Sequence, residues 1–318
     1  MSKETVTLVD GYVPVIDLSS RGGEAGRVAL ADAIGRACET SGFYVVVGHG
    51  VPSDLVERMR TVTNAFFRLP DAEKDLVASR PGVSGYRRSG GTTARSLDRS
   101  TPPDMCEAFG VHVTGDLPDA ERARLGDYPS TWRLANAWPA NPPGFTATWR
   151  EYLAAVTALA DDLVRLSARA LGLPEEHFAD RFGRHVSSLV ANYYYPRVHD
   201  PLPGQLRRGA HTDFGALTVL YQEHDNGGLQ VLRGEDDWRD VRAVPGGLVV
   251  NIGDLMALWS GGRWVSTMHR VVNAEPGNTS SRLSIPFFHQ PDHDAPAGDV
   301  TAGEWMAEKT RKLFAPAD

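Results

Sequence analysis

The second half of the chain alternates short apolar stretches with turn residues, and this pattern limits the folds that it can adopt. The stretches are rich in β-branched and aromatic residues, and Gly, Pro and Asp separate them. They cover residues 189–195, 216–223, 228–232, 238–241, 248–252, 265–273 and 282–289. Short strands with turn signals at this density are typical of a sandwich, jelly roll or barrel. We therefore expect an all-β core over residues 187–318.

Helices are expected to dominate the first half. Apolar residues recur at three- and four-residue steps over 26–41, after Pro52, and from 143 to 171, which predicts three amphipathic helices. Apolar runs at 13–18 and 43–47 predict two short strands. The sequence thus suggests a leader of helices and strands over 1–115, a connecting loop with a long supporting helix over 116–186, and the β core.

Composition restricts the partners of such a chain. A net charge of -7 argues against binding to a nucleic-acid backbone, which needs a concentrated basic surface. No stretch approaches 18 apolar residues, so no membrane span is expected. The first ten residues lack the features of a signal peptide, and the two cysteines lie far apart. We expect a cytoplasmic protein with free thiols, as a monomer or small homo-oligomer.

The tripeptide His211-Thr212-Asp213 lies inside the expected core. In an extended strand, residues i and i+2 point to the same face, so His211 and Asp213 would lie side by side. A second histidine, His269, follows in another strand-like run. Two histidines and one carboxylate on one side of a metal form the facial triad of non-haem Fe(II) oxygenases. A His-x-Asp tripeptide is also common without any metal, so the interpretation depends on the rest of the chain.

Arg282 and Ser284 repeat the same i, i+2 spacing shortly after His269. One strand face would then carry a guanidinium and a hydroxyl together. Arginine recognises carboxylates through two parallel hydrogen bonds, so the pair suits a dicarboxylic co-substrate. The alternative is an internal salt bridge with Asp or Glu.

Further motifs occur in the order found in one enzyme family. In the first half they are Val13-Pro14-Val15-Ile16-Asp17-Leu18, Gly42-Phe43-Tyr44, Gly48-His49-Gly50-Val51-Pro52, residues 104–109 and Asn136-Ala137-Trp138-Pro139. In the second half they are His211-Thr212-Asp213, Gly228-Leu229-Gln230-Val231, Asn251-Ile252-Gly253-Asp254, His269-Arg270-Val271 and Arg282-Leu283-Ser284-Ile285-Pro286. Over nearly its whole length the chain resembles the Fe(II)/2-oxoglutarate-dependent oxygenases of the isopenicillin N synthase-like family.

This resemblance implies an α+β fold with a double-stranded β-helix, or jelly-roll, core flanked by helices. It implies that His211, Asp213 and His269 bind Fe(II), and that Arg282 and Ser284 hold the distal carboxylate of 2-oxoglutarate. The segment Asn192-Tyr193-Tyr194-Tyr195-Pro196 corresponds to a family strand on which an asparagine and a tyrosine assist. Tyr195 stands where the family often has proline, so Tyr193, Tyr194 and Tyr195 all remain candidates. Strand alternation places Asn192 and Tyr194 on one face and favours Tyr194.

The expected reaction is hydroxylation, desaturation or ring closure of a small molecule in secondary or other small-molecule metabolism. It would consume O2 and convert 2-oxoglutarate to succinate and CO2. Three alternatives stay open: an iron oxidase of the same fold that does not use 2-oxoglutarate, a non-catalytic β-barrel binding protein, and a metal-dependent hydrolase on a cupin-like barrel.

The substrate pocket is expected to include residues 85–98, Phe214 and the tail from Phe288 onward. The first segment holds Tyr86, Arg87, Arg88 and Arg95, whose guanidinium groups could engage an acidic or hydroxylated molecule or could simply be solvated. His49 and His112 are expected to be structural. His289 and His293 are expected at the surface or the pocket rim.

Overall fold

The computed structural model describes residues 6–9, 12–90, 102–123, 134–197, 200–223 and 227–314. The strands are β1 Val6–Val9, β2 Val13–Asp17, β3 Phe43–Val47, β4 Val83–Ser84, β5 Tyr86–Arg87, β6 Glu107–His112, β7 Ala135–Asn136, β8 Ser188–Tyr194, β9 Arg208–His211, β10 Leu217–Gln222, β11 Leu229–Arg233, β12 Asp237–Asp240, β13 Leu248–Ile252, β14 His269–Val271, β15 Arg282–His289, β16 Pro296–Ala297 and β17 Val300–Thr301. The α-helices are α1 Glu24–Thr40, α2 Ser53–Phe67, α3 Asp71–Asp75, α4 Asp119–Ala123, α5 Phe145–Ala170, α6 Asp254–Trp259 and α7 Ala302–Phe314, and the 3-10 helices are η1 Leu18–Ser20, η2 Val113–Asp116 and η4 Glu175–Arg181. Arg95 and residues 91–101 around it lie outside the described part.

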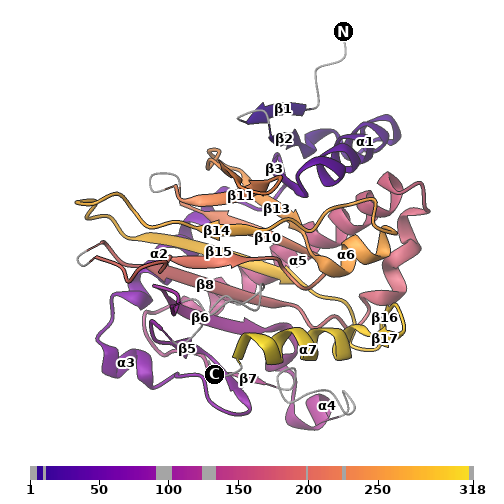
Figure 1. Ribbon diagram of the computed structural model, residues 1–318. Coiled ribbons are helices and arrows are strands. Elements are labelled where there is room, and N and C mark those ends of the chain that lie inside the picture. Colours follow the sequence, from indigo (N-terminus) through magenta and orange to yellow (C-terminus); the bar gives the residue numbers. More distant parts are fainter. Residues whose placement is uncertain are drawn as a thin grey trace.

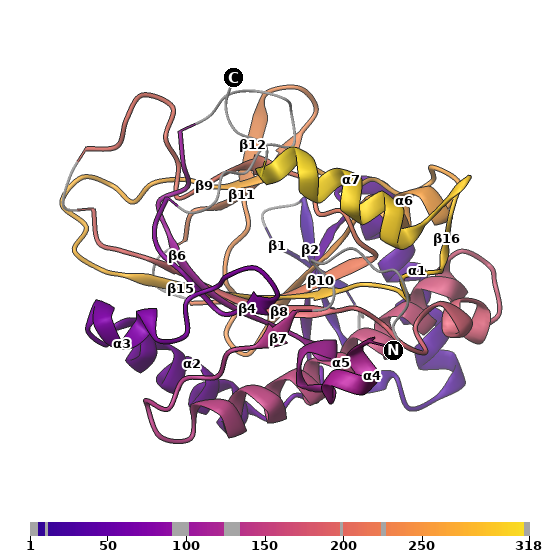
Figure 2. The same cartoon turned by 90° about the horizontal axis from the view of Figure 1, so that it is seen from below.

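Two facing sheets form the core of the molecule (Figures 1 and 2). The main sheet has nine strands in the order β1-β2-β3-β13-β10-β15-β8-β6-β5, and the minor sheet has the order β12-β11-β14-β9. A buried cluster that includes Phe43, Tyr194, Leu229 and Val271 lies between them. This architecture confirms the expected jelly roll with flanking helices.

Strands from the first half of the chain extend the main sheet on both sides. On one side, β3 pairs antiparallel with β13 and parallel with β2. On the other side, β6 pairs with β8, and the short edge strand β5 pairs with β6. The leader segment therefore contributes hydrogen-bonded strands to the same sheet as the second half of the chain.

The long helix α5 supports the outer face of the main sheet. Its apolar side chains recur at helical spacing and are buried, among them Trp149, Tyr152, Val156 and Leu163. Together with α1, α2 and the outward side chains of the sheet, they form the largest core cluster. Figure 2 shows α2 and α5 below the sheet, on the side away from β9, β11 and β12. The helices thus leave the inner face of the main sheet free to form a site.

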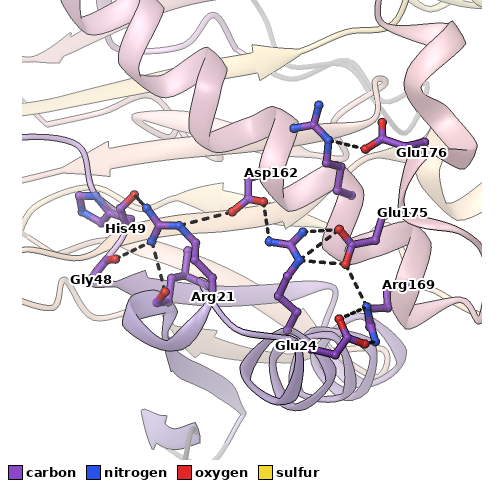
Figure 3. Close-up of polar contacts among 11 residues, drawn as sticks. Arg21, Glu24, Gly48, His49, Asp162, Arg169, Glu175 and Glu176 are labelled. Carbon is purple, nitrogen blue, oxygen red and sulfur yellow. Dashed lines mark hydrogen bonds and ion pairs between the residues drawn. The ribbon is translucent and has the colours of Figure 1, made fainter.

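A network of arginines and carboxylates ties α1 to α5 and to η4 (Figure 3). Arg27 on α1 forms hydrogen bonds with Glu175 (2.8 Å) and with Asp162 on α5 (2.9 Å). Arg21 donates to the carbonyl oxygens of Gly48 (2.8 Å) and His49 (3.1 Å). The His49 ring contacts the carbonyl of Gly246 (3.0 Å) and accepts a hydrogen bond from the backbone of Val51 (3.1 Å). His49 is therefore a structural residue of this turn, as predicted.

Most of the expected elements are present, and the differences fall in segments without clear periodicity. The stretch 265–273 is a strand only over His269–Val271, and the segment 80–90 contains the short strands β4 and β5 rather than loop alone. The sequence analysis missed α6, α7 and the β16–β17 pair, because short amphipathic segments next to Gly and Pro resemble loops.

Candidate metal centre

His211, Asp213 and His269 converge on the inner face of the minor sheet. His211 ends β9 and His269 begins β14, and the two residues are direct partners in the β9–β14 pairing. Their ring centroids are 4.2 Å apart. One ligand atom from each of the three residues lies within 4.8 Å of the others, and no other such cluster occurs among the described residues. The structure thus brings together the three residues that the sequence singled out.

Backbone carbonyls orient both imidazoles. Nδ1 of His211 donates to the carbonyl of Gly209 (2.8 Å), and Nδ1 of His269 donates to that of Thr267 (3.2 Å). A carbonyl can only accept, so the proton sits on Nδ1 and the lone pair on Nε2. Both Nε2 atoms face Oδ1 of Asp213, at 3.9 Å and 3.8 Å.

Two buried side chains fix the carboxylate of Asp213. Its Oδ2 accepts hydrogen bonds from Thr218 Oγ1 (2.6 Å) and Asn251 Nδ2 (2.8 Å). Thr218 and Asn251 are paired across β10 and β13, so the main sheet positions both donors. Oδ1 is left to face the two imidazoles.

Asp213 does not lie in a strand, contrary to the expectation for His211-Thr212-Asp213. Strand β9 ends at His211, and the carbonyl of Asp213 accepts a hydrogen bond from the backbone of Asp254 (2.8 Å) instead. A side chain on Gly253 would collide with the carbonyl oxygens of Gly215 and Asp213. This close backbone approach is the physical reason for glycine in Asn251-Ile252-Gly253-Asp254.

The charges of the three side chains suit a divalent cation. Burial lowers the pKa of His211, as do the neighbouring His269 and Arg208. Burial alone would raise the pKa of Asp213, but the two imidazoles and the hydrogen bonds from Asn251 and Thr218 outweigh it and lower the pKa. A neutral His211 imidazole beside an ionised carboxylate offers the donors that Fe(II) takes from a facial triad.

Arg282 is buried with much of its hydrogen-bonding capacity unused. The side chain is 1% exposed, its Nη2 donates to Gln222 (3.1 Å), and its Nε and Nη1 have no hydrogen-bond partner in the described structure. Burial lowers the pKa of this guanidinium. None of the described carboxylates pairs with Arg282 within 4.0 Å, which does not support the salt-bridge alternative. Since a buried cation is costly without an anion, these free donors fit a bound carboxylate.

The other predicted co-substrate residues surround Arg282. Strand pairing sets Tyr194 opposite Arg282 and Asn192 opposite Ser284. The Arg282 guanidinium carbon lies 5.1 Å from the centroid of the Tyr194 ring, and Ser284 is a hydrogen-bonding neighbour of that tyrosine. Tyr193 instead stacks on Phe67 across the opposite face of the sheet (5.1 Å). Tyr195 is 41% exposed. The geometry therefore favours Tyr194.

One cavity of about 150 Å³ connects these groups. Its lining includes the three triad residues, Asn192, Tyr194, Ser284, Arg87 and Arg208, together with apolar side chains such as Phe43, Val190, Leu220 and Phe288. A larger groove of about 1110 Å³ lies elsewhere, along α2, and none of the triad residues lines it. The predicted chemistry is thus located in the smaller cavity, between the two sheets.

Phe214 and His289, also predicted for the pocket or its rim, are not among the residues that line this cavity. Phe214 belongs to a small cluster with Val186, Trp305 and Met306, and Trp305 on α7 donates to its carbonyl (3.2 Å). His289 is fully buried and pairs with Asp161 (3.1 Å), so the expectation of a surface or rim position was wrong. His112 also has no place in the metal cluster.

The sequence analysis missed four residues that support the site: Thr218, Asn251, Asp104 and Arg208. Asp104 accepts a hydrogen bond from the backbone of Gly209 (2.9 Å) and pairs with Arg208 (3.0 Å), which braces β9 beside His211. Asn251 and Asp104 had a sequence signal, because they lie in the motifs Asn251-Ile252-Gly253-Asp254 and 104–109. The others depend on strand pairing that the sequence does not display.

Two family sequence models match the chain. Residues 186–291 match the 2OG-Fe(II) oxygenase superfamily. Residues 13–141 match the N-terminal region of non-haem dioxygenases described for morphine synthesis. The two matches cover both sheet-forming halves of the molecule.

Similar proteins are found by sequence and by structure. A validamycin A dioxygenase of Streptomyces hygroscopicus subsp. limoneus is 36% identical over 90% of this chain and 78% of its own. A homoarginine-6-hydroxylase of Glycine max is 34% identical over 89% of this chain and 86% of its own. The crystal structure of full-length Neurospora crassa T7H in complex with alpha-KG has a TM-score of 0.80 at 26% identity, over 96% of this chain and 99% of that one.

These similarities extend over almost the whole chain, and the function of the relatives agrees with the residues that line the cavity. The cavity holds a His-Asp-His cluster that could bind a metal ion, and Arg282 nearby has two nitrogens without a hydrogen-bond partner in the described structure. The chain belongs to the 2OG-Fe(II) oxygenase superfamily and is a non-haem dioxygenase that uses Fe(II) and 2-oxoglutarate to act on a small molecule.

Proposed function

We propose that this enzyme hydroxylates a small organic molecule, with His211, Asp213 and His269 as the iron ligands and Arg282 as the anchor of 2-oxoglutarate. One observation carries the proposal. The two imidazoles and the carboxylate of the triad line the same cavity as Tyr194 and Ser284. These two residues lie beside the buried guanidinium of Arg282, whose Nε and Nη1 have no hydrogen-bond partner in the described structure. The binding-protein and hydrolase alternatives do not require both features together, and the formation of succinate distinguishes the oxidase alternative.

Bound iron and 2-oxoglutarate supply the oxidation itself, in which 2-oxoglutarate and O2 are consumed and succinate and CO2 are released. The chain positions the reactants. Asn251 and Thr218 direct Oδ1 of Asp213 toward the metal position, and the carbonyls of Gly209 and Thr267 direct the imidazoles. Arg282, Ser284 and Tyr194 hold the distal carboxylate, with Asn192 beside them on the same face. The apolar walls of the cavity exclude water from the reacting atoms.

Proteins with similar structures have been crystallised with different small molecules. The Neurospora crassa enzyme has been crystallised with alpha-KG and thymine, and JOX2 with 2OG, Fe and JA. The JOX2 structure has a TM-score of 0.71 at 27% identity over 92% of this chain and 82% of that one. A small-molecule substrate is accordingly proposed here, within secondary or other small-molecule metabolism.

Cellular location and assembly are proposed from simpler features. No helix among the described residues is long and apolar enough to cross a membrane. Both cysteines are buried free thiols, which fits a reducing compartment, and we propose the cytoplasm. The net charge of -7 supports the absence of a nucleic-acid partner, and a monomer or small homo-oligomer is proposed for the assembly.

The test is the formation of succinate. The iron-loaded protein is incubated with 2-oxoglutarate, O2 and a set of candidate small molecules, and succinate and oxidised products are measured. The proposal predicts that succinate and hydroxylated product form in equal amounts with a true substrate. Consumption of a substrate without any succinate would contradict it and support the oxidase alternative.

A further inference from the structure

Arg87 lies on the inner face of the main sheet, beyond the residues assigned to 2-oxoglutarate. In the β-pairing, Arg87 is opposite Ala108, Ala108 is opposite Asn192, and Asn192 is opposite Ser284. Directly paired residues point to the same face of a sheet, and all four line the cavity. Three strand spacings of about 4.8 Å place the backbone of Arg87 about 14 Å from that of Ser284. The side chain therefore enters the cavity from the side opposite the co-substrate anchor.

The guanidinium of Arg87 has no anionic partner among the described residues. Its Nε is buried without a hydrogen-bond partner, and none of the described carboxylates pairs with it within 4.0 Å. Its Nη2 lies over Gly110, where an added Cβ would be 3.9 Å away. The guanidinium thus lies beside Gly110 of β6 on the cavity wall.

The titratable neighbours of Arg87 are cationic or neutral at pH 7. Burial lowers the pKa of Arg87, and the nearby Arg208 lowers it further. Burial lowers the pKa of His112 to about 4, and burial raises the pKa of the Cys106 thiol to about 11, so both are uncharged. Asp104, the acid that pairs with Arg208, is engaged by that arginine and by the backbone of Gly209.

The rigid support of Arg87 comes from the opposite face of the sheet. Its neighbour Tyr86 donates to Glu107 (2.6 Å), and Glu107 also pairs with the buried Lys74 (3.0 Å). Glu107 alternates with the cavity-facing Ala108 and is therefore unavailable to Arg87. The next residue, Arg88, is exposed and forms ion pairs with Asp75 and Asp71. The two adjacent arginines therefore differ: Arg88 forms ion pairs at the surface, whereas Arg87 lines the cavity and has no anionic partner among the described residues.

We propose that Arg87 binds the carboxylate of the primary substrate, and that the enzyme therefore acts on acidic small molecules. The inference rests on the proposed oxygenase function, because it assigns the substrate class of that site. A buried cation without a counter-ion is destabilising, and an arginine fork pairs with a carboxylate through two hydrogen bonds. Arg282 is reserved for 2-oxoglutarate and Arg208 is paired with Asp104, so among the described residues that line the cavity Arg87 is the cation without an anionic partner.

The test compares acids with their uncharged analogues. Aliphatic and aromatic carboxylic acids and their primary amides are titrated into the protein loaded with Fe(II) and 2-oxoglutarate, under anaerobic conditions, with calorimetric detection. Each pair differs in charge but hardly in size. We expect pairs in which the acid binds at least tenfold more tightly than the amide. Arg87→Gln should abolish that preference, Arg87→Lys should keep part of it, and Arg88→Gln is the matched control that should keep all of it.

Two further measurements separate the possible explanations. The Kd for 2-oxoglutarate should stay within twofold of the wild type in Arg87→Gln, and the unfolding temperature should not fall, because the substitution removes a partly buried charge that has no anionic partner among the described residues. If no acid binds more tightly than its amide, or if Arg87→Gln keeps the preference, the assignment is overturned. A large rise in the Kd for 2-oxoglutarate, or a clear loss of stability, would instead assign Arg87 to the co-substrate or to the fold. Failure of the oxygenase function itself would appear separately, as absence of succinate.

Discussion

The hydrogen bond from Thr218 to Asp213 offers a sharp test of how the metal centre is built. Thr218→Val keeps the branched shape of the side chain but removes the hydroxyl that donates to Oδ2 of Asp213 at 2.6 Å. Both residues are buried, and Asn251 remains as the other donor to that oxygen. The substitution therefore removes one of two side-chain hydrogen bonds to this carboxylate oxygen.

The expected magnitude follows from the charge on the acceptor. A hydrogen bond to a charged group contributes roughly 1.5–3 kcal/mol. Because about 1.4 kcal/mol corresponds to a factor of ten, the Kd for Fe(II) should rise about 10- to 100-fold. This range agrees with the roughly 10- to 100-fold loss of metal affinity usual when a group that orients a ligand is removed.

The assay is an anaerobic titration of Fe(II) into the metal-free protein, together with thermal unfolding. Thr63→Val is the matched control, because Thr63 accepts a buried hydrogen bond from Trp149 (3.1 Å) far from the triad. The control should lose stability but bind Fe(II) as the wild type does. The reasoning is refuted if Thr218→Val binds Fe(II) within twofold of the wild type, or if Thr63→Val weakens binding equally.

Three other predictions concern the co-substrate anchor, the backbone beside the triad and the effect of pH. Arg282→Gln should raise the Kd for 2-oxoglutarate roughly 30-fold or more, since loss of one partner of a buried charge pair costs about 2–5 kcal/mol; calorimetry with 2-oxoglutarate checks this, and an unchanged Kd would contradict it. Gly253→Ala should weaken both Fe(II) binding and stability, because its Cβ would displace the backbone of Asp213 and Gly215; wild-type values of both would contradict the close approach. Burial lowers the pKa of His112 to about 4 in the folded chain, whereas the ordinary pKa of 6.5 applies in the unfolded chain. Between these two pH values, His112 is protonated in the unfolded chain but not in the folded one. The free energy of unfolding should therefore fall as the pH drops from about 6.5 to 4, by up to about 1.4 kcal/mol per pH unit for this residue. Denaturant unfolding measured at several pH values should show a smaller fall for His112→Gln than for the wild type, and an equal fall would contradict this assignment.

Short-range patterns in the sequence predicted the parts of the site that lie on single strands. The i, i+2 spacing put Arg282 with Ser284 and Asn192 with Tyr194, and the structure pairs these residues across β8 and β15. The same reasoning placed His211 beside Asp213 but gave the wrong local structure, because the chain leaves β9 at His211. The two side chains still meet, since the backbone of Asp254 holds the turn in place.

Long-range pairing could not be predicted from the sequence. Thr218 and Asn251 meet Asp213 only because β10 and β13 are neighbours in the main sheet. Arg87 was a candidate among several loop arginines, and what distinguishes it is a two-residue edge strand. Such a short strand has no periodicity of its own, and its register depends on the neighbouring strand β6.

The most direct test of the central claim is an anaerobic titration of 2-oxoglutarate into the Fe(II)-loaded protein, followed by visible absorption. The account holds that His211, Asp213 and His269 leave one side of the metal open to the co-substrate. It therefore predicts a weak charge-transfer band that saturates with 2-oxoglutarate in the wild type and is lost in His211→Ala. No band in the wild type, or an equal band in His211→Ala, would contradict the account.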